Sequence, residues 1–334
     1  MKARWSRSLK PALLTLILVA GAVPILIPFL WMLSTSLKPR DLAAEYPPRW
    51  LPVNEHHYLT MNGRREEVTV LMAEQGGQTK IKTPEGRTVR VPSSALTTVR
   101  RFEPQWGNYA RILTRKHKDS DDDFLRFLLN TLLIAGLSVI GQALSSALVG
   151  WGFARLRFAG KNALFMVMLA TMMIPGQIGI IPTFMIFRRL GWIDTFLPLI
   201  VPAWFGSAFF AFLYRQYFLG IPIEMDEAAK VDGAGPLRIF WDILLPMARP
   251  VTVTVAVYTF FGAWNDFLGP LIYLNSDSKR TLSLALEKFQ SAQATPDMPV
   301  LMAAAALMLL PVLVIYFFSQ RALMQGMVIS GVKG

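Results

Sequence analysis

The sequence predicts an all-α membrane protein with six transmembrane helices and a small extracytoplasmic β insertion. Of its 334 residues, 53% are hydrophobic and only 17% are charged, and the mean hydropathy is +0.39. Soluble domains have about 25% charged and 45–50% apolar residues, so this excess is too large for an ordinary core. The apolar residues also gather in long uncharged runs, and a helix needs about 20 such residues to cross a bilayer. These observations together predict helices embedded in lipid.

Five runs without charged residues mark the clearest spans. They are bounded by charged residues and cover 11–37, 127–154, 162–187, 195–214 and 298–320. A sixth run, 250–274, is apolar except for Asp266. We therefore predict six spans at about these positions, with the fourth reaching residue 215.

The first run could instead belong to a cleaved signal peptide, because it follows a basic segment. The apolar region of a signal peptide is usually about 7–15 residues long and ends at a cleavage site of small residues. This run is longer and contains Pro24, Pro28 and Trp31 without such a site. Residues 1–37 are therefore predicted to be a cytoplasmic N-terminus and a retained first span.

Lys and Arg in the short loops indicate the orientation of the spans. Cytoplasmic loops carry an excess of these residues, whereas long loops cross the membrane largely regardless of charge. With a cytoplasmic N-terminus, 13 of the 34 Lys and Arg residues lie inside and five lie in short outer loops. The other 16 lie in the long segment 38–126. Both termini are therefore predicted to be cytoplasmic. The net charge of +12 then mainly reflects the orientation of the spans and does not indicate nucleic-acid binding.

The extracytoplasmic segment 38–126 is predicted to contain a small β unit at about residues 60–100. Apolar residues there alternate with polar ones, and Pro84-Glu85-Gly86 is typical of a turn. We expect three or four antiparallel strands, which would serve either as a stable decoration or as a docking surface for an external partner. The acidic run 119–123 lacks the glycine and the distant glutamate of a calcium-binding EF-hand loop, which favours a solvated helix start.

The residue types needed for most catalytic and metal sites are scarce in this sequence. It contains no cysteine, which excludes disulfides and thiolate chemistry, and only three histidines. It also contains no G-x-x-x-x-G-K-[ST] motif, the loop that cradles nucleotide phosphates in many ATPases. We therefore predict no catalytic residue, metal site or cofactor in this chain.

The segment 218–250 joins the fourth and fifth predicted spans on the cytoplasmic side. Pro222 suits the first position of a helix, and three acidic residues follow in the first turn, where the helix dipole favours negative charge. Alanines continue this helix until Gly233, and Pro236 begins a second helix that ends at Pro246. Small residues on an exposed helix permit close approach of another protein.

The sequence EAAKVDGAGPLRIFWDILLP in this segment resembles the EAA loop of permease subunits in ATP-binding-cassette (ABC) importers. The wider pattern is similar to the carbohydrate-uptake branch typified by the maltose permease pair. Three other features resemble the same branch: WNDFLGPLIYL (264–274), the ending QRALMQGMVISGVKG (320–334) and Asn130 at the head of the second span. The resemblance covers essentially the whole chain except about residues 56–100, an insertion that typical members lack.

This resemblance implies the type I ABC importer permease architecture in a bacterial inner membrane, with a permease core over residues 127–334. It implies uptake of a sugar, an oligosaccharide or a polyol. The implied partners are a second homologous permease, two ATPase subunits that bind ATP and Mg, and an extracytoplasmic solute-binding protein. The outer loop 275–298 would contact the solute-binding protein, and the C-terminal tail 321–334 would reach the ATPases.

The family's EAA helix docks on the ATPase, so the resemblance also assigns roles to residues of the loop. Glu227, Ala228 and Ala229 would form the docking face. Asp232 and Gly233 would set the bend that follows it. ATP-driven closure of the two ATPases would then move the spans through this loop.

Asn265, Asp266 and Gln177 are candidates for the translocation path. An ionisable group at membrane depth usually faces a cavity, although Asp266 could instead be hydrated or paired near the outer interface. Gln177 follows Pro175 and Gly176, which could mark either a pathway or a plain kink in the third span. Aromatic side chains could stack on sugar rings, but in a membrane protein they more often serve in packing.

Two other functional classes are weighed against an importer permease. An ion-coupled secondary transporter would act without an ATPase and is typically built from internal repeats, and we find no convincing repeat in this sequence. An intramembrane enzyme would need a group of catalytic side chains at membrane depth, where Asp266 stands alone.

Overall fold

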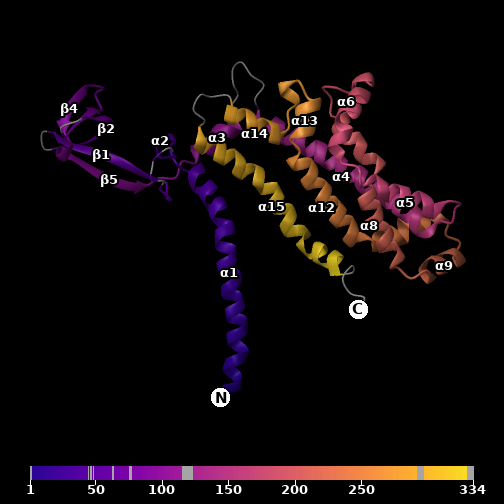
Figure 1. The fold of residues 1–334 in the computed structure, drawn as a ribbon. Coiled ribbons are helices and arrows are strands. Elements are labelled where there is room, and N and C mark those ends of the chain that lie inside the picture. Colours follow the sequence, from indigo (N-terminus) through magenta and orange to yellow (C-terminus); the bar gives the residue numbers. More distant parts are fainter. Residues whose placement is uncertain are drawn as a thin grey trace. The chain divides into compact units, whose positions relative to one another are not determined.

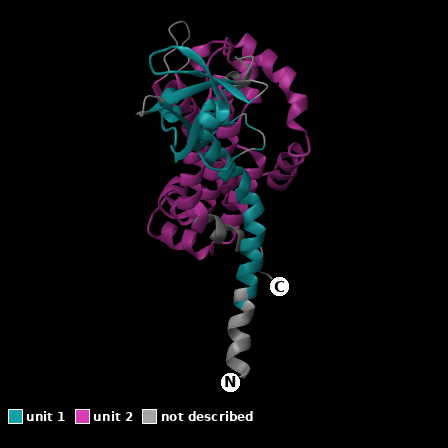
Figure 2. Cartoon of the chain, turned by 90° about the vertical axis from the view of Figure 1, so that its left-hand side faces the viewer, with its two compact units in different colours: residues 1–112, 292–306 teal, residues 113–291, 307–334 magenta. Residues whose placement is uncertain are grey.

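A computed structural model describes residues 2–43, 45, 47, 49–61, 64–74, 77–114, 123–291 and 297–328. The acidic run apart from Asp123, and the last residues of the C-terminal tail, lie outside the described residues. The chain divides into two compact units, which Figure 2 shows in different colours. Unit 1 comprises residues 1–112 and 292–306, and unit 2 comprises residues 113–291 and 307–334.

Unit 1 begins with the helix α1 (Lys2–Ser36), which covers the first predicted span. The part Leu13–Ser36 is long and apolar enough to cross a membrane. Two short helices follow, α2 (Arg40–Ala43) before the sheet and α3 (Gly107–Thr114) after it, of which the last two residues belong to unit 2. Asn108 of α3 donates its amide to the carbonyls of Ser36 and Lys38, at 2.7 and 2.9 Å. It thereby satisfies backbone acceptors that the end of α1 leaves free.

The β insertion is a single antiparallel sheet with the strand order β4-β3-β2-β1-β5 (Figure 1). Its strands are β1 (Val53–Met61), β2 (Arg64–Glu74), β3 (Gln78–Lys82), β4 (Thr88–Pro92) and β5 (Leu96–Phe102). Leu59, Val68 and Ile81 form its buried core. The predicted turn at Pro84-Glu85-Gly86 is confirmed, since it joins β3 to β4.

The sheet has more strands than the three or four that the sequence predicts, and it begins earlier, at Val53. The first strand is polar and shows no alternation, so its pairing is invisible in the sequence. Its polar side chains are instead held by neighbouring charges. The His56 ring contacts Glu67 at 2.6 Å and Glu103 at 3.0 Å. These two hydrogen bonds raise the pKa of His56 above its usual value.

Unit 2 is helical and contains most of the predicted spans. Its helices are α4 (Phe124–Arg155), α5 (Lys161–Thr171), α6 (Ile180–Arg189), α7 (Leu197–Ile200), α8 (Ala208–Leu219), α9 (Glu224–Val231), α10 (Pro236–Ile239), α11 (Leu245–Met247), α12 (Arg249–Asn265), α13 (Leu268–Tyr273) and α14 (Leu282–Ser291). The last helix, α15 (Met298–Val328), begins in unit 1 and continues into unit 2.

Four helical segments in the described part of the chain are long and apolar enough to cross a membrane, and two bent helix pairs raise this number to six if each pair is one span. The four are Leu13–Ser36, Phe124–Arg155, Leu197–Leu219 and Met298–Arg321. The bent pairs are Lys161–Thr171 with Gly176–Arg189, and Pro236–Met247 with Arg249–Asn265. The chain is therefore a multi-pass membrane protein of four to six spans.

Three of the predicted spans are interrupted. The fourth divides into α7, a 3₁₀ segment (Val201–Phe205) and α8, with Gly206 at a φ of +78° before α8. The third bends by 88° where α5 ends and a 3₁₀ turn (Gly176–Gly179) begins, just after Pro175. Proline cannot continue the helical hydrogen-bond ladder, which explains a break here. The predicted span 250–274 also divides, because α12 ends at Asn265 and α13 starts at Leu268. Asp266 therefore lies in a break between two helices.

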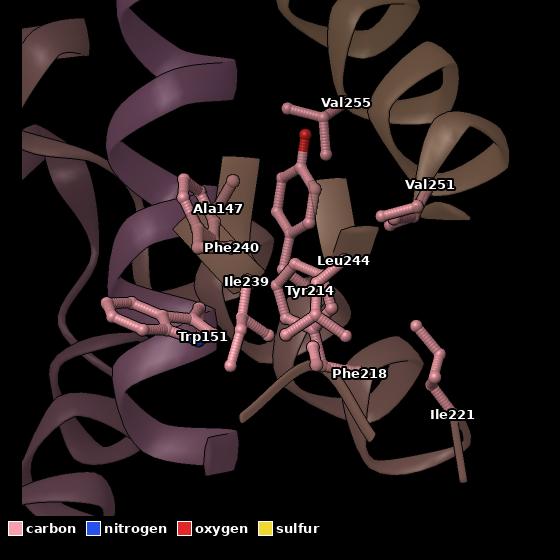
Figure 3. Packing of buried hydrophobic residues seen from close by; sticks show 12 residues of the cluster. Ala147, Trp151, Tyr214, Phe218, Ile221, Ile239, Phe240, Leu244, Val251 and Val255 are labelled. Carbon is pink, nitrogen blue, oxygen red and sulfur yellow. The ribbon is translucent and has the colours of Figure 1, made fainter. Parts of the chain in front are cut away.

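The buried core of unit 2 joins the loop 218–250 to the helices around it. Tyr214 and Phe218 of α8 pack with Trp151 of α4 and with Phe240 from the loop (Figure 3). Ala229 of α9 belongs to the same cluster. Replacing a buried aromatic side chain by alanine lowers the free energy of unfolding by about 3–5 kcal/mol, so this cluster is a main source of stability for the loop.

Gly150 permits the close contact between α4 and α8. A Cβ atom at this position would lie 2.6 Å from the Cβ of Tyr214 and 2.9 Å from the backbone of Ala211 and of Arg215. Backbone atoms cannot give way as a flexible side chain can, so this crossing requires a glycine. Small residues at helix crossings are typical of membrane proteins, where close packing drives association.

The substitution Gly150→Ala is therefore expected to destabilise the helical unit. Gly136 of the same helix provides a matched control, because a Cβ there meets no atom within 4 Å. Alanine favours a helix over glycine by about 1 kcal/mol, so Gly136→Ala should be neutral or slightly stabilising. Thermal unfolding in detergent would compare the two variants. Equal midpoints would contradict the close packing of α4 on α8.

Candidate functional site

The helix α9 lies where the sequence predicts the cytoplasmic docking helix. It starts at Glu224, two residues after Pro222, and carries Glu224, Asp226 and Glu227 in its first turn. At its other end, the amide of Ala234 donates to the carbonyl of Ala229 at 2.9 Å. The amide of Gly233 donates to the carbonyl of Lys230 at 3.0 Å, and Gly233 has a φ of +80°.

These two hydrogen bonds form a Schellman motif, which ends a helix with a residue in the left-handed conformation. Glycine adopts that conformation without steric cost. Asp232 is the C-cap residue and is exposed. The structure thus places Asp232 and Gly233 at the end of α9, where the chain turns.

The two faces of α9 differ sharply in exposure. Glu227 and Ala228 are exposed, and Val231 is 88% exposed. Ala229 is only 7% exposed and packs in the core of unit 2. The sequence groups Ala229 with Glu227 and Ala228 on one docking face, but in this chain it lies on the opposite side of the helix. Glu224, Glu227, Ala228 and Val231 share one exposed face, at helical spacings of three and four residues, and Met225 and Lys230 at its margins are exposed as well.

Asp226, on the buried face of α9, pairs with Arg155 at the end of α4. The Arg155 Nε and the Asp226 Oδ2 are 3.4 Å apart, and the two side chains are only 8% and 7% exposed. Arg155 Nη2 also donates to the carbonyl of Ile221 at 2.7 Å, just before α9. One guanidinium therefore contacts both the helix and the segment leading into it. The hydrogen bond is the one to Ile221, because Arg155 Nε and Asp226 Oδ1 are buried without a hydrogen-bond partner among the described residues.

Sequence reasoning did not single out this ion pair. The available signal was the position of Asp226 three residues before Ala229, which places the two on one helix face. A charged residue on the same face as a buried alanine needs a partner. Arg155 is the first charged residue after the second apolar run, but Arg215, Lys230 and Arg238 lie closer to Asp226 along the chain, so the sequence does not identify the partner.

Other basic side chains gather at the same end of α4. Arg215 Nε donates to the carbonyl of Phe153 at 3.2 Å, and Lys161 Nζ donates to that of Leu156 at 2.9 Å. The end of a helix exposes free carbonyls and the negative pole of its dipole, so cations are favoured there. The count of Lys and Arg in the short loops predicts that these residues are cytoplasmic, and their position at the end of α4 agrees with that prediction.

The second helix of the loop starts at Pro236, as predicted, and continues to Met247. Residues Phe240–Leu244 form a π-helical turn in which the amide of Leu245 donates to the carbonyl of Phe240. Pro246 follows directly and has no amide to donate, which explains an irregular ladder at this place. The chain then bends by 77° into α12.

The candidate path residues each lie at or beside a break in a helix. Gln177 is exposed in the 3₁₀ turn after Pro175. Asn265 is the last residue of α12 and donates to the carbonyl of Phe261 at 2.9 Å. Asp266 accepts from the amide of Gly269 at 3.1 Å and so starts the next helical turn. Their part in a translocation path stays a prediction.

Breaking the pair through Asp226→Asn is expected to destabilise the loop strongly. Arg155 would then remain buried without a countercharge, which typically costs about 3–5 kcal/mol. Unfolding in detergent and proteolysis of residues 220–235 would measure the effect. Asp242→Asn is the control in the same loop, because its pair with Arg238 is exposed and such pairs contribute about 0–1 kcal/mol. Equal effects of both variants would contradict a structural role for the buried pair.

Comparison with known proteins identifies relatives of this chain. An arabinooligosaccharide transport system permease protein, AraQ of Halalkalibacterium halodurans, is 32% identical over 205 residues, which are 61% of this chain and 73% of AraQ. The sn-glycerol-3-phosphate transport system permease protein UgpE of Yersinia pestis is 31% identical over 226 residues, which are 67% of this chain and 80% of UgpE. Both comparisons cover most of the relative.

Among solved structures, the chain resembles one subunit of a bacterial ABC transporter involved in the import of the acidic polysaccharide alginate. The match has a TM-score of 0.67 and 20% sequence identity, and it covers 95% of this chain and 97% of the other. At this identity the match shows a shared fold. Residues 146–329, more than half of the chain, match the family of binding-protein-dependent transport system inner membrane components. The chain belongs to this family, and it is the membrane-embedded permease component of an ABC importer rather than an ion-coupled transporter.

Proposed function

We propose that this chain is half of the translocation pathway of a carbohydrate importer and that α9 couples it to a partner ATPase. The exposed face of α9 is the observation that carries the proposal. Glu227 offers a carboxylate to a basic side chain, and Ala228 allows the partner to approach the helix backbone closely. On the opposite face of α9, the Arg155–Asp226 pair connects the helix to the end of α4.

The proposed complex contains this chain, a second homologous permease, two ATPase subunits and an extracytoplasmic solute-binding protein. ATP and Mg would be bound by the ATPase subunits, because this sequence has no phosphate-binding glycine loop of its own. The two states of the importer would then be biased by ATP on one side and by the loaded receptor on the other.

We propose a cytoplasmic location for both termini and for α9. Support comes from the excess of Lys and Arg in the corresponding short loops. The basic side chains at the end of α4, next to α9, agree with this orientation. The β sheet and the start of α4 would then lie on the extracytoplasmic side.

The proposed cargo is a sugar, an oligosaccharide or a polyol. Support comes from the names of relatives, since AraQ is described as an arabinooligosaccharide permease and the similar solved structure belongs to an alginate importer. UgpE, described as a permease for sn-glycerol-3-phosphate, indicates that a polyol derivative also fits this family.

Charge reversal at the exposed face tests the coupling role. Glu227→Lys should leave the protein inserted in the membrane but abolish co-purification with the ATPase, because a lysine would replace the carboxylate at the contact. Hydrolysis of ATP stimulated by the sugar-loaded solute-binding protein should be lost as well. Both quantities would be measured on the assembled complex in lipid nanodiscs.

Glu85→Lys is the matched control for this experiment. It makes the same change of charge at an exposed position in the turn between β3 and β4, where the Glu85 side chain is 72% exposed. It should leave co-purification with the ATPase unchanged, because the β sheet lies far along the chain from α9. Normal coupling in Glu227→Lys would show that the exposed face of α9 is not the docking surface.

A further inference from the structure

Asp194, in the turn before α7, has an unusual backbone conformation. Its φ of 61° is the only positive value at a residue other than glycine in the part of the chain that the structure describes. Aspartate and asparagine tolerate this left-handed conformation better than other side chains do. The Asp194 amide donates to the carbonyl of Tyr273 at 2.7 Å. The turn is thereby tied to the end of α13.

The Asp194 carboxylate holds the segment that follows α13. Its Oδ1 accepts from the amides of Asn275 and Ser276, at 3.0 and 2.9 Å. Its Oδ2 accepts from the Ser276 hydroxyl at 2.5 Å and from the Lys279 ammonium at 3.1 Å. The hydrogen bonds from Ser276 are the main reason that the pKa of Asp194 lies well below its usual range. The carboxylate is therefore charged at neutral pH and can accept all four bonds.

The first turns of α4 hold the continuation of the same segment. Asn130 Nδ2 donates to the carbonyls of Ser278 and Arg280, both at 3.0 Å. The amide of Leu282 donates to the Thr131 hydroxyl at 2.8 Å, and Thr131 is buried. Side chains of two separate elements thus satisfy backbone groups from Asn275 to Leu282, a stretch with little secondary structure of its own.

We propose that Asp194 is a positioning residue that, together with Asn130 and Thr131, holds residues 275–282 as a rigid platform for the solute-binding protein. The inference rests on the proposed function, in which the outer loop 275–298 contacts that protein. Side chains of other elements hold this segment at both of its ends and at points between them. A segment fixed before binding loses less conformational entropy when the receptor docks.

The test uses the complete importer in nanodiscs with its cognate solute-binding protein, purified with bound solute. Asp194→Ala removes the carboxylate and should raise the receptor concentration for half-maximal ATPase stimulation about 10-fold or more, because the loop must now be ordered during binding. Hydrolysis without receptor should not change. Asp194→Asn tolerates the backbone conformation and keeps one acceptor oxygen, so its shift should be smaller.

A spin label on Asn275→Cys reports the loop directly, without any receptor. This chain contains no cysteine, so within it the label attaches at one position. Its spectrum should show an immobilised label in the parent protein and a mobile label in Asp194→Ala. Asn130→Asp is a second, isosteric variant that cannot donate to the two carbonyls, and it should mobilise the label and shift receptor dependence as well.

The outcomes separate this inference from the proposed function. An unchanged half-maximal receptor concentration in Asp194→Ala and Asn130→Asp, with normal stimulation of the parent complex, would overturn the platform and leave the importer role intact. An immobile label in both variants would overturn it too. Absence of receptor stimulation in the parent complex would contradict the proposed function itself.

Discussion

The buried ion pair between Arg155 and Asp226 is the contact on which the geometry of the coupling loop depends. Residues of an α-helix are rotated by about 100° from one to the next. Once Asp226 faces α4, the same rotation directs Glu227, Ala228 and Val231 outward and Ala229 into the core. Turning α9 would separate Asp226 from Arg155, and a buried charge without its partner is costlier than a displaced alanine, so the ion pair favours this rotation of α9.

One helix links this pair to the opposite end of the unit. Asn130 and Thr131 hold the segment 275–282 near the start of α4, and Arg155 holds α9 at its end. These positions are 25 residues apart, or about 37 Å along the helix, which exceeds the roughly 30 Å of the hydrocarbon core. The helix α4 is continuous and contains no proline, whereas the helices after it bend by 88° and 77°. A rigid element therefore joins two loops that belong to opposite membrane surfaces in the proposed orientation.

The sequence predicts those features that follow from long patterns. The apolar runs predict the spans, the acidic first turn and Gly233 predict the bounds of α9, and Pro84-Glu85-Gly86 predicts one turn of the sheet. Features set by tertiary partners are not visible in it. The strand β1 is polar because its charges are paired with other segments, and Ala229 is buried by residues that are distant in sequence. Asp194 appears unremarkable until its backbone conformation and its bonds to Ser276 are seen.

The most direct test of the account is cross-linking from single cysteines on the two faces of α9. The chain has no cysteine of its own, so Ala228→Cys and Ala229→Cys can each carry one photoreactive label in the assembled importer. Illumination should join the ATPase subunit to this chain from position 228, which is exposed, and not from position 229, which is buried. An absent adduct at 228, or equal adducts from both positions, would contradict the assignment of the exposed face as the docking surface.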